Sequence, residues 1–344
     1  YKMKVYKLPI GSPTGRGKAL VNLLPLAEGE TITTLMPLPE DEQSWEDLFV
    51  VFATASGNVR RNRLSDFVRV KANGKIAMKL DQGDRLIGVA TCDEGDDVLL
   101  ATTGAKCIRF RLTDVRVFQG RNSTGVRGIR LSNKAEVISM SVLQHTEYST
   151  AERSAYLKRS RFERADGNIT DDETDNYERD FEDQENTKQN GLTISDELYE
   201  KMAGEEQFVL TVTAKGFGKR SSAYEYRVAG RGGQGIANID MGKMKDNSVI
   251  SSFPVEKDTE LVMMTDGGQL IRTGVSDVRI AGRSTRGVTL FRVAKNENVV
   301  TVTPMRDDAN TEENSEESNP TPDEPDDENN NVEKESFTEV SDDE

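Results

Sequence analysis

The chain has 344 residues, of which 35% are hydrophobic and 31% are charged, and its formal net charge at pH 7 is −15. Its only cysteines are Cys92 and Cys107, and its only histidine is His145. These counts exclude a disulfide framework and a histidine-cluster metal site, and they argue against a classical catalytic triad. No apolar run approaches the ~18 residues of a membrane span. We therefore expect a protein of the reducing, cytoplasmic compartment without a membrane partner.

The first residues alternate between basic and apolar side chains, as a half-exposed β-strand does. The strand pattern includes the first residue of the chain, in the stretch Tyr1-Lys2-Met3-Lys4-Val5-Tyr6. The sequence is therefore expected to be a fragment of a longer protein.

The negative charge is confined to two parts of the chain. Residues 307–344 hold 17 acids and one base, and residues 144–206 hold 18 acids and 8 bases, whereas the other 243 residues hold 25 acids and 36 bases. We expect the tail 307–344 to be disordered and the insertion 144–206 to be mostly disordered, with a short helix capped by Ser195. The alternative is that both segments are solvated surface without a role.

The basic part of the chain is a repeat. The pattern Gly-x-x-x-Φ-x-Φ, where Φ is apolar, occurs five times, starting at Gly17, Gly74, Gly125, Gly235 and Gly287. The intervals are 57, 51, 110 and 52 residues, and without the 63-residue insertion the interval of 110 becomes 47. The repeat is therefore about 50 residues long, a period typical of propeller-like arrays.

A second element precedes the last four copies of this pattern. It is an apolar run, a turn with glycine and a strand that carries an arginine, at Arg61, Arg109, Arg220 and Arg272. Each unit then predicts four short strands, which is one blade of an all-β, propeller-like fold in which neighbouring blades share a core. The expected boundaries are a partial blade at 1–38 and four blades near 47–92, 95–142, 207–255 and 258–306.

The surplus bases recur with the repeat, which predicts a positive rim that binds duplex DNA through phosphates rather than through base sequence. The candidate rim residues are Arg16, Lys18, Arg60, Arg61, Arg63, Lys75, Arg109, Arg111, Arg121, Arg127, Lys219, Arg220, Arg231, Arg272, Arg283 and Arg286. Further surplus bases include Arg69, Arg116, Arg227 and Arg279.

Two alternatives remain open for these bases. Any single lysine or arginine is more simply a solubilising surface charge. The four strand arginines could instead pair with the acid that follows each of them five residues later, which is Asp66, Asp114, Glu225 or Asp277. No set of acid, base and nucleophile stands out, so we expect neither a catalytic residue nor a metal site.

Several stretches of the chain resemble one known family. These are residues 1–9, 15–17, 21–26, 122–131, 216–220 and 264–268. They are similar to the C-terminal domain of the bacterial DNA gyrase A protein. The resemblance implies a β-pinwheel, a propeller-like disc that wraps DNA chirally around its basic edge and so makes ATP-dependent negative supercoiling possible.

The resemblance also implies partners and cofactors. The partners would be duplex DNA, the rest of a homodimeric gyrase A protein, and the gyrase B protein in an A2B2 assembly near the nucleoid. The catalytic tyrosine and the ATPase of this type IIA topoisomerase belong to parts outside the fragment. We therefore expect no catalytic centre and no cofactor here, with ATP and Mg bound elsewhere in the holoenzyme.

The chain departs from the family pattern in further respects. The first blade, which in the family normally carries the DNA-wrapping box Gln-Arg-Arg-Gly-Gly-Lys-Gly, is expected to be missing from this fragment. The nearest stretch, 230–235, lies in a later blade and lacks the tandem arginines. We interpret it as a degenerate repeat loop, the alternative being a functional second box. The insertion 144–206 is longer than the usual connection. The resemblance suggests that the acidic tail modulates wrapping, because a tethered polyanion can compete with phosphate for the rim.

Two other functions remain possible. The first is that of the corresponding C-terminal domain of topoisomerase IV, which binds DNA without strong chiral wrapping. The second is a propeller-like platform for protein partners, in which the acidic segments bind basic proteins.

Overall fold

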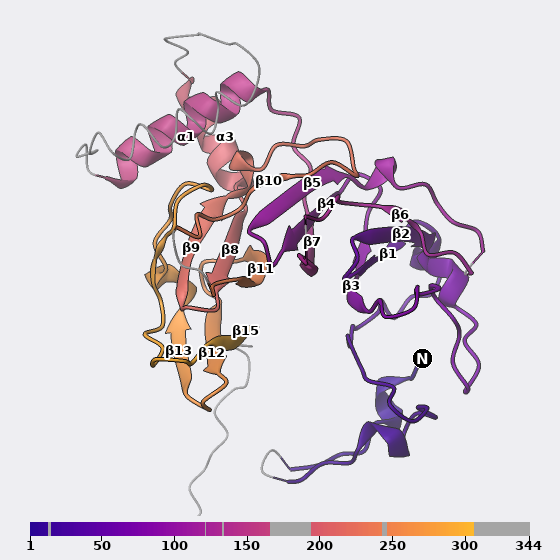
Figure 1. Cartoon of the computed structure of the whole chain (residues 1–344). Coiled ribbons are helices and arrows are strands. Elements are labelled where there is room, and N and C mark those ends of the chain that lie inside the picture. Colours follow the sequence, from indigo (N-terminus) through magenta and orange to yellow (C-terminus); the bar gives the residue numbers. More distant parts are fainter. Residues whose placement is uncertain (13–14, 121, 133, 166–193, 243–245, 306–344) are drawn as a thin grey trace, which may run out of the picture. The chain divides into compact units, whose positions relative to one another are not determined.

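The structure is a computed structural model that describes residues 1–12, 15–120, 122–132, 134–165, 194–242 and 246–305. In this part of the chain the strands form three four-stranded sheets and one three-stranded sheet, and all their strand pairs are antiparallel (Figure 1). The expected all-β, propeller-like class is confirmed. We number the sheets first to fourth in chain order.

Each sheet is built on a hairpin that comes directly from the apolar run, the turn and the arginine strand of the repeat. The hairpins are β1 (Phe49–Thr54) with β2 (Asn58–Arg63), β4 (Asp97–Thr102) with β5 (Lys106–Arg111), β8 (Phe208–Thr213) with β9 (Phe217–Ser222), and β12 (Glu260–Thr265) with β13 (Leu270–Gly274). β-branched and aromatic residues favour these strands, since their side chains pack well on a pleated surface.

A further long strand of the same repeat pairs with the first strand of each hairpin. These strands are β3 (Leu86–Cys92), β7 (Val137–Leu143), β11 (Val249–Val255) and β15 (Val299–Met305). They also contact one another in chain order, β3 with β7, β7 with β11 and β11 with β15. Consecutive sheets are therefore neighbours through these strands.

The fourth strand of a sheet comes from the next repeat, which corrects the expected blade composition. The short strands β6 (Val126–Arg127), β10 (Ile236–Ala237) and β14 (Val288–Thr289) follow the repeated glycine, and they pair with β2, β5 and β9 of the preceding sheet. The second hairpin strand has a free edge that its own repeat does not fill, so the chain of the following repeat satisfies it.

We call the place where one repeat completes the sheet of the preceding one a joint. At each joint a residue eight or nine positions before the short strand also forms a parallel bridge with the strand arginine of the preceding sheet. The pairs are Arg61 with Val117, Arg109 with Val228 and Arg220 with Ile280. Backbone hydrogen bonds accompany the bridges, for example from the Phe118 N–H to the Arg61 carbonyl at 2.8 Å. Each joint is thus fixed at two points along one strand.

The repeated glycine is required by its approach to the neighbouring strand. Gly125, Gly235 and Gly287 all have positive φ, at 87°, 73° and 78°. A Cβ at any of them would lie 2.3 Å from a carbonyl oxygen of the preceding hairpin strand. Because other residues carry a Cβ and rarely adopt this conformation, the glycine sets how closely two repeats can join.

The hydrophobic core lies between consecutive sheets. One cluster joins the first and second sheets through residues such as Val51 and Leu100, and another joins the third and fourth through residues such as Val212 and Met263. A third cluster joins the second and third sheets. The expectation that neighbouring blades share a core agrees with these clusters.

Residues 1–48 do not form the partial blade expected at 1–38. Their described part contains three short 3₁₀ helices (Val5–Lys7, Leu20–Asn22 and Ser44–Glu46) and no strand. Part of this segment packs on the first sheet without pairing as a strand, since Trp45 is buried in one cluster with Val50 and Phe52 of β1.

The insertion contains more helix than expected. Helix α1 (Thr150–Arg164) begins with a capping box between Ser149 and Glu152, and helix α3 (Asp196–Glu205) begins after Ser195, whose hydroxyl accepts the Leu198 N–H. The helix expected after Ser195 is confirmed, while the expectation of disorder is wrong for 150–164. Figure 1 shows the two helices side by side above β8 and β9. The acidic stretches 166–193 and 306–344 lie outside the described residues.

Both helices pack on the third sheet through one aromatic cluster. Tyr156, Tyr199 and Met202 are buried around Tyr224, which lies in the 3₁₀ turn after β9. The corresponding turn positions of the other repeats hold Ser65, Thr113 and Ser276. The tyrosine therefore gives this repeat alone an apolar surface on which the insertion can dock.

Candidate nucleic-acid interface

The strand arginines occupy one equivalent position in the four hairpins. Arg61, Arg109 and Arg220 are buried with exposed fractions of 4%, 4% and 9%, whereas the side chain of Arg272 in the three-stranded sheet is 53% exposed. The first three lie at joints, where the next repeat covers them. Their burial corrects the expectation that they belong to an exposed rim.

The hairpin itself supplies a partner for each strand arginine. In the first and third sheets the guanidinium lies over an aromatic ring, with 4.6 Å from Arg61 to the Phe49 centroid and 5.9 Å from Arg220 to Phe208. In the second sheet Arg109 forms an ion pair of 2.8 Å with Asp97. In the fourth sheet Arg272 pairs with Glu260. The same place in the hairpin is thus filled by either a ring or a carboxylate, and both attract a cation.

The pairing expected with an acid five residues later is not found for Arg61 or Arg109. The carboxylate at Arg61 is Glu94, 3.6 Å away, and the carboxylate at Arg109 is Asp97. Sequence spacing could not reveal these partners, since Asp97 lies across the hairpin and Glu94 lies in the loop before the second one.

At two joints the buried arginine also binds the backbone of the next repeat. Arg109 donates from Nη1 to the Ala223 carbonyl at 2.9 Å, and Arg220 donates to the carbonyls of Val278 and Ser276 at 2.7 and 3.1 Å. Burial lowers the pKa of the Arg109 guanidinium, although the Asp97 carboxylate opposes this effect. The arginine remains a cation because carboxylate and carbonyl oxygens replace its water. These arginines connect one repeat to the next.

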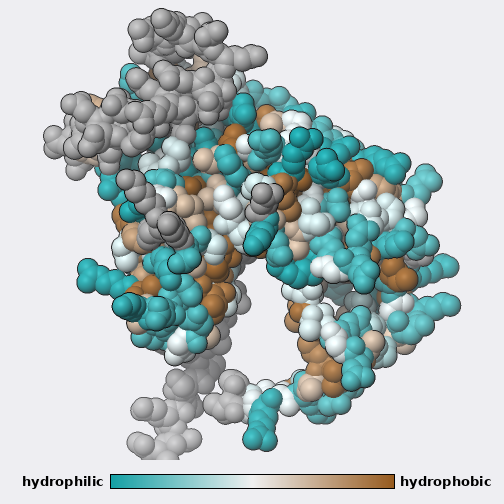
Figure 2. All heavy atoms as spheres, in the orientation of Figure 1, coloured by the Kyte–Doolittle hydropathy of each residue, from teal (hydrophilic) through white to brown (hydrophobic). Residues whose placement is uncertain are grey.

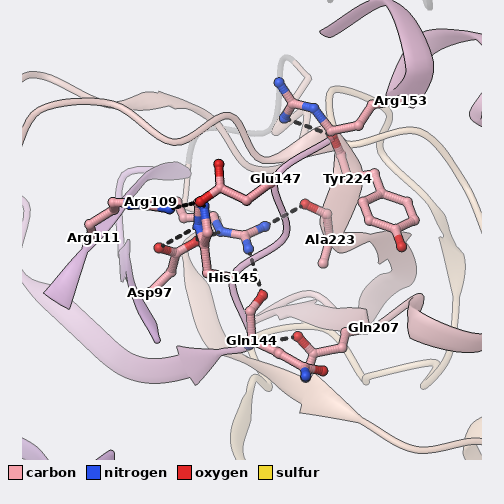
Figure 3. A network of polar contacts seen from close by, with 10 residues as sticks. All are labelled: Asp97, Arg109, Arg111, Gln144, His145, Glu147, Arg153, Gln207, Ala223 and Tyr224. Atoms are coloured by element: carbon pink, nitrogen blue, oxygen red, sulfur yellow. Dashed lines mark hydrogen bonds and ion pairs between the residues drawn. The ribbon is translucent and has the colours of Figure 1, made fainter. Parts of the chain in front are cut away.

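The contacts of Arg109 extend to the start of the insertion (Figure 3). Its second terminal nitrogen donates to the Gln144 carbonyl at 3.0 Å, and His145 Nδ1 lies 2.9 Å from the same Asp97 carboxylate. Glu147 approaches His145 Nε2 at 3.4 Å. This polar cluster anchors the chain where it leaves β7 for the helices.

Three other candidate rim residues are buried as well. Arg60 and Lys219 have no exposed surface, and Arg283 is 4% exposed. Lys219 Nζ donates to the Gly282 carbonyl at 2.5 Å, Arg60 donates to the Ser123 carbonyl at 2.7 Å, and Arg283 donates to the Glu225 carbonyl at 3.2 Å. These side chains satisfy backbone oxygens of loops at the joints and are not presented to a ligand.

The remaining candidates are more accessible. Lys75 and Arg111 are half-buried, Arg121 lies outside the described residues, and the exposed candidates are Arg16, Lys18, Arg63, Arg127, Arg231, Arg272 and Arg286. Some of these are also held by neighbours, since Arg231 donates to the carbonyls of Asp114 and Arg127. Hydrophilic side chains cover most of the described surface on the face shown in Figure 2.

Four of the surplus arginines that the sequence analysis did not choose as rim candidates share one position relative to the turn. Arg69, Arg116, Arg227 and Arg279 each follow the acid of the 3₁₀ turn by two or three residues, and the last three immediately precede the bridging residue of a joint. The signal was an acid-Φ-Arg-Φ pattern that recurs in three repeats. It could have been found by aligning the repeats on their turns rather than on their glycines.

No group of three or more histidine, cysteine, aspartate or glutamate side chains in the described residues could hold a metal ion. Across the same residues, no helix is both long and apolar enough to span a membrane.

Comparison with known proteins identifies the family of this repeat. The model of the family described as "DNA gyrase C-terminal domain, beta-propeller" matches residues 1–39, 49–93, 96–144, 207–254 and 259–304. These matches take in all five copies of the glycine pattern. The chain therefore belongs to the DNA gyrase C-terminal domain family, as its resemblance suggested.

Curated relatives share one name, that of the DNA gyrase A protein, along most of this chain. The protein of Granulibacter bethesdensis is 49% identical over 316 residues, which are 91% of this chain and 34% of that protein. The protein of Rickettsia bellii is 44% identical over 303 residues, which are 87% of this chain and 32% of that protein. The protein of Escherichia coli is 33% identical over 300 residues, which are 87% of this chain and 27% of that protein. The chain thus spans about a third of the length of these relatives or less.

Solved structures show the same fold at low sequence identity. The C-terminal domain of DNA topoisomerase IV aligns with a TM-score of 0.60 at 15% identity, covering 84% of this chain and 71% of the other. A DNA gyrase A C-terminal domain aligns with a TM-score of 0.55 at 17% identity, covering 86% of this chain and 77% of the other.

Proposed function

We propose that this chain, a member of the DNA gyrase C-terminal domain family, binds duplex DNA without sequence specificity and wraps it chirally along its exposed cations. The observation that carries the proposal is that the family model matches every repeat and omits the acidic insertion and tail. Exposed arginines on successive repeats suit phosphate contacts, which neutralise charge and release counterions without reading bases.

The role of the whole protein is inferred from the relatives that are similar to this chain in sequence. In this proposal the chain serves a type IIA topoisomerase that supercoils DNA negatively at the expense of ATP in the bacterial cytoplasm. Its partners are the rest of the gyrase A protein, as a homodimer, and the gyrase B protein in an A2B2 assembly. The chemistry, ATP and Mg belong to other parts of that assembly, and this chain contributes the path of the DNA.

The acidic tail would regulate this binding. Residues 307–344 contain 17 acids and are tethered to the repeats, so they are present at high effective concentration near the cations. A tethered polyanion that competes with phosphate lowers DNA affinity at low salt, where the attraction is strongest. The acidic insertion, whose helices pack on the third sheet, would also lower the affinity for DNA.

A linking-number assay tests the proposal. The chain, alone and within the whole gyrase A protein, is incubated with nicked circular plasmid, the nick is ligated, and the linking number is read on a gel after the protein is removed. A positive shift that grows with protein supports chiral wrapping. A larger shift without residues 307–344 supports inhibition by the tail.

The other outcomes point to the alternatives. Binding without a change of linking number would favour a domain of the topoisomerase IV kind, which the TM-score of 0.60 keeps as a second candidate. No binding even at low salt would contradict the proposal and favour a platform for protein partners.

A further inference from the structure

Three arginines occupy equivalent places at the three joints. Arg116, Arg227 and Arg279 each directly precede the residue that bridges to the buried strand arginine of the preceding sheet, which is Val117, Val228 or Ile280. They are separated by one repeat each, apart from the insertion. We call these three residues the joint row.

The local backbone directs Arg116, at the first joint, away from the core. Successive side chains of an extended segment point to opposite sides, so a row arginine and the bridging residue after it face opposite ways. Val117 packs against the core shared by the first two sheets, and Arg116 is exposed. Arg279 is also exposed, whereas at the middle joint Arg227 is half-buried and the bridging Val228 is 37% exposed.

Stacking and backbone bonds hold the row in place. The Arg116 guanidinium lies 4.3 Å from the centroid of Phe118, whose N–H donates to the Arg61 carbonyl. At the last joint, the Arg220 N–H donates to the Arg279 carbonyl at 3.0 Å. A cation whose backbone is bonded to the preceding sheet gives up less conformational freedom when it binds a ligand.

Two of the buried strand arginines bind the backbone that leads to a row arginine. Arg220 binds the carbonyls of Ser276 and Val278, which lie three residues and one residue before Arg279. Arg109 binds the carbonyl of Ala223, which begins the turn leading to Arg227. At these two joints the buried arginine helps to set the position of the row arginine, and at the first joint the backbone bridge between Arg61 and Val117 does so.

We propose that Arg116, Arg227 and Arg279 contact successive phosphates of the duplex DNA path, one at each joint. This inference rests on the proposed function and specifies its contact residues. A guanidinium presents a planar fork of donors that suits phosphate oxygens, and such contacts position DNA without reading its sequence. The row differs from the candidates chosen from sequence, six of which are buried.

The test compares two triple variants of the full chain. The first is Arg116→Gln, Arg227→Gln and Arg279→Gln. The control removes the same charge at Arg85, Lys106 and Lys134, which are exposed near the hairpin turns of the first two sheets. Affinity for a duplex oligonucleotide is measured by fluorescence anisotropy over a series of KCl concentrations.

The joint row predicts a specific change in salt dependence. Each phosphate contact contributes about 0.9 to the slope of log affinity against log salt, so loss of three contacts lowers the slope by about 2.7 and weakens binding by about 10²–10³-fold at 0.1 M salt. The control variant should change the slope by less than about 1. A third variant with lysine at the three row positions should keep the slope, because the cations remain.

The outcomes separate the two proposals. If the unaltered chain does not bind duplex DNA at low salt, the proposed function fails and the row fails with it. If the chain binds but the row and control variants lose affinity and slope equally, the row is refuted while DNA binding stands. If the lysine variant loses the slope although thermal unfolding shows it folded, the arginines act through packing, and the phosphate assignment is wrong.

Discussion

The substitution Gly287→Ala should open the joint between the third and fourth repeats without unfolding either sheet. Gly287 has a φ of 78°, and a Cβ there would lie 2.3 Å from the Gly218 carbonyl oxygen. The left-handed conformation alone costs an alanine about 1–2 kcal/mol. The contact adds to this cost, because the opposing atom belongs to a β-strand backbone and not to a flexible side chain.

Gly83→Ala is the matched control. Gly83 has nearly the same φ, 81°, but nothing lies within 4 Å of its Cβ position. It therefore isolates the conformational cost from the cost of close approach. At Gly287 the chain can relieve the clash only by giving up joint hydrogen bonds, such as those from the N–H groups of Leu290 and Phe291 to the Gly216 carbonyl. With about 1 kcal/mol for each bond, we expect an extra loss of about 2–3 kcal/mol at the joint.

Amide hydrogen exchange measures this loss where it occurs. An extra cost of about 2–3 kcal/mol corresponds to exchange that is about 30- to 150-fold faster at Leu290 and Phe291 in Gly287→Ala. The core amides of β8 and β12 should keep their protection, and Gly83→Ala should leave the joint unchanged. Equal effects of the two substitutions on overall stability, with no local change at 288–291, would refute the argument that the glycine is needed for close approach.

Individual side chains support three more predictions. Tyr224→Ser should weaken the docking of α1 and α3 on the third sheet by about 3–5 kcal/mol. The expected result is rapid proteolysis within 150–205 while the sheets remain folded. Continued protection of the helices would contradict the docking role of the tyrosine ring. Hydrogen bonds from the Ser149 hydroxyl and N–H lower the pKa of Glu152. The capping box should therefore stabilise α1 fully above the ordinary glutamate pKa, and this stabilisation should be lost as the pH falls through the lowered pKa of Glu152. NMR chemical shifts of α1 should follow this titration in the wild type and not in Glu152→Gln. Burial raises the pKa of the thiols of Cys92 and Cys107 to about 12. Both thiols should therefore react with a disulfide reagent at pH 8 at least about 10³-fold more slowly in the native chain than in denaturant. Fast labelling of the native chain would contradict this and show that the two thiols are accessible to solvent.

Much of the fold could be read from the repeat. The apolar runs, the turns and the basic strands predicted the hairpins, and Ser195 predicted the start of α3. Helix α1 was missed, although Ser149 and Glu152 have the spacing of a capping box, which is a sequence signal for a helix start. The acidic composition of the whole insertion concealed a segment with five basic residues between 150 and 164.

The candidate interface was harder to predict than the fold. A row of bases in a sequence is by default a solvated surface, since lysine and arginine are rarely buried without partners. Here Lys219 is buried because the loop of the next repeat brings the Gly282 carbonyl to it, and Arg283, in that same loop, is buried against the Glu225 carbonyl of the preceding repeat. Nothing in the local sequence distinguishes such a residue from an exposed one such as Arg286.

The order of residues along the chain was enough to establish the repeat, the β class and the division of charge between basic repeats and acidic additions. Packing of the repeats against one another was needed to show which sheet each short strand joins and which arginines face solvent. A strand's alternating pattern shows which face is apolar, but its backbone hydrogen bonds can be made with any neighbouring edge. The partner edge, and many of the oxygens around a buried cation, come from a neighbouring repeat, and they are in place only once two repeats have come together.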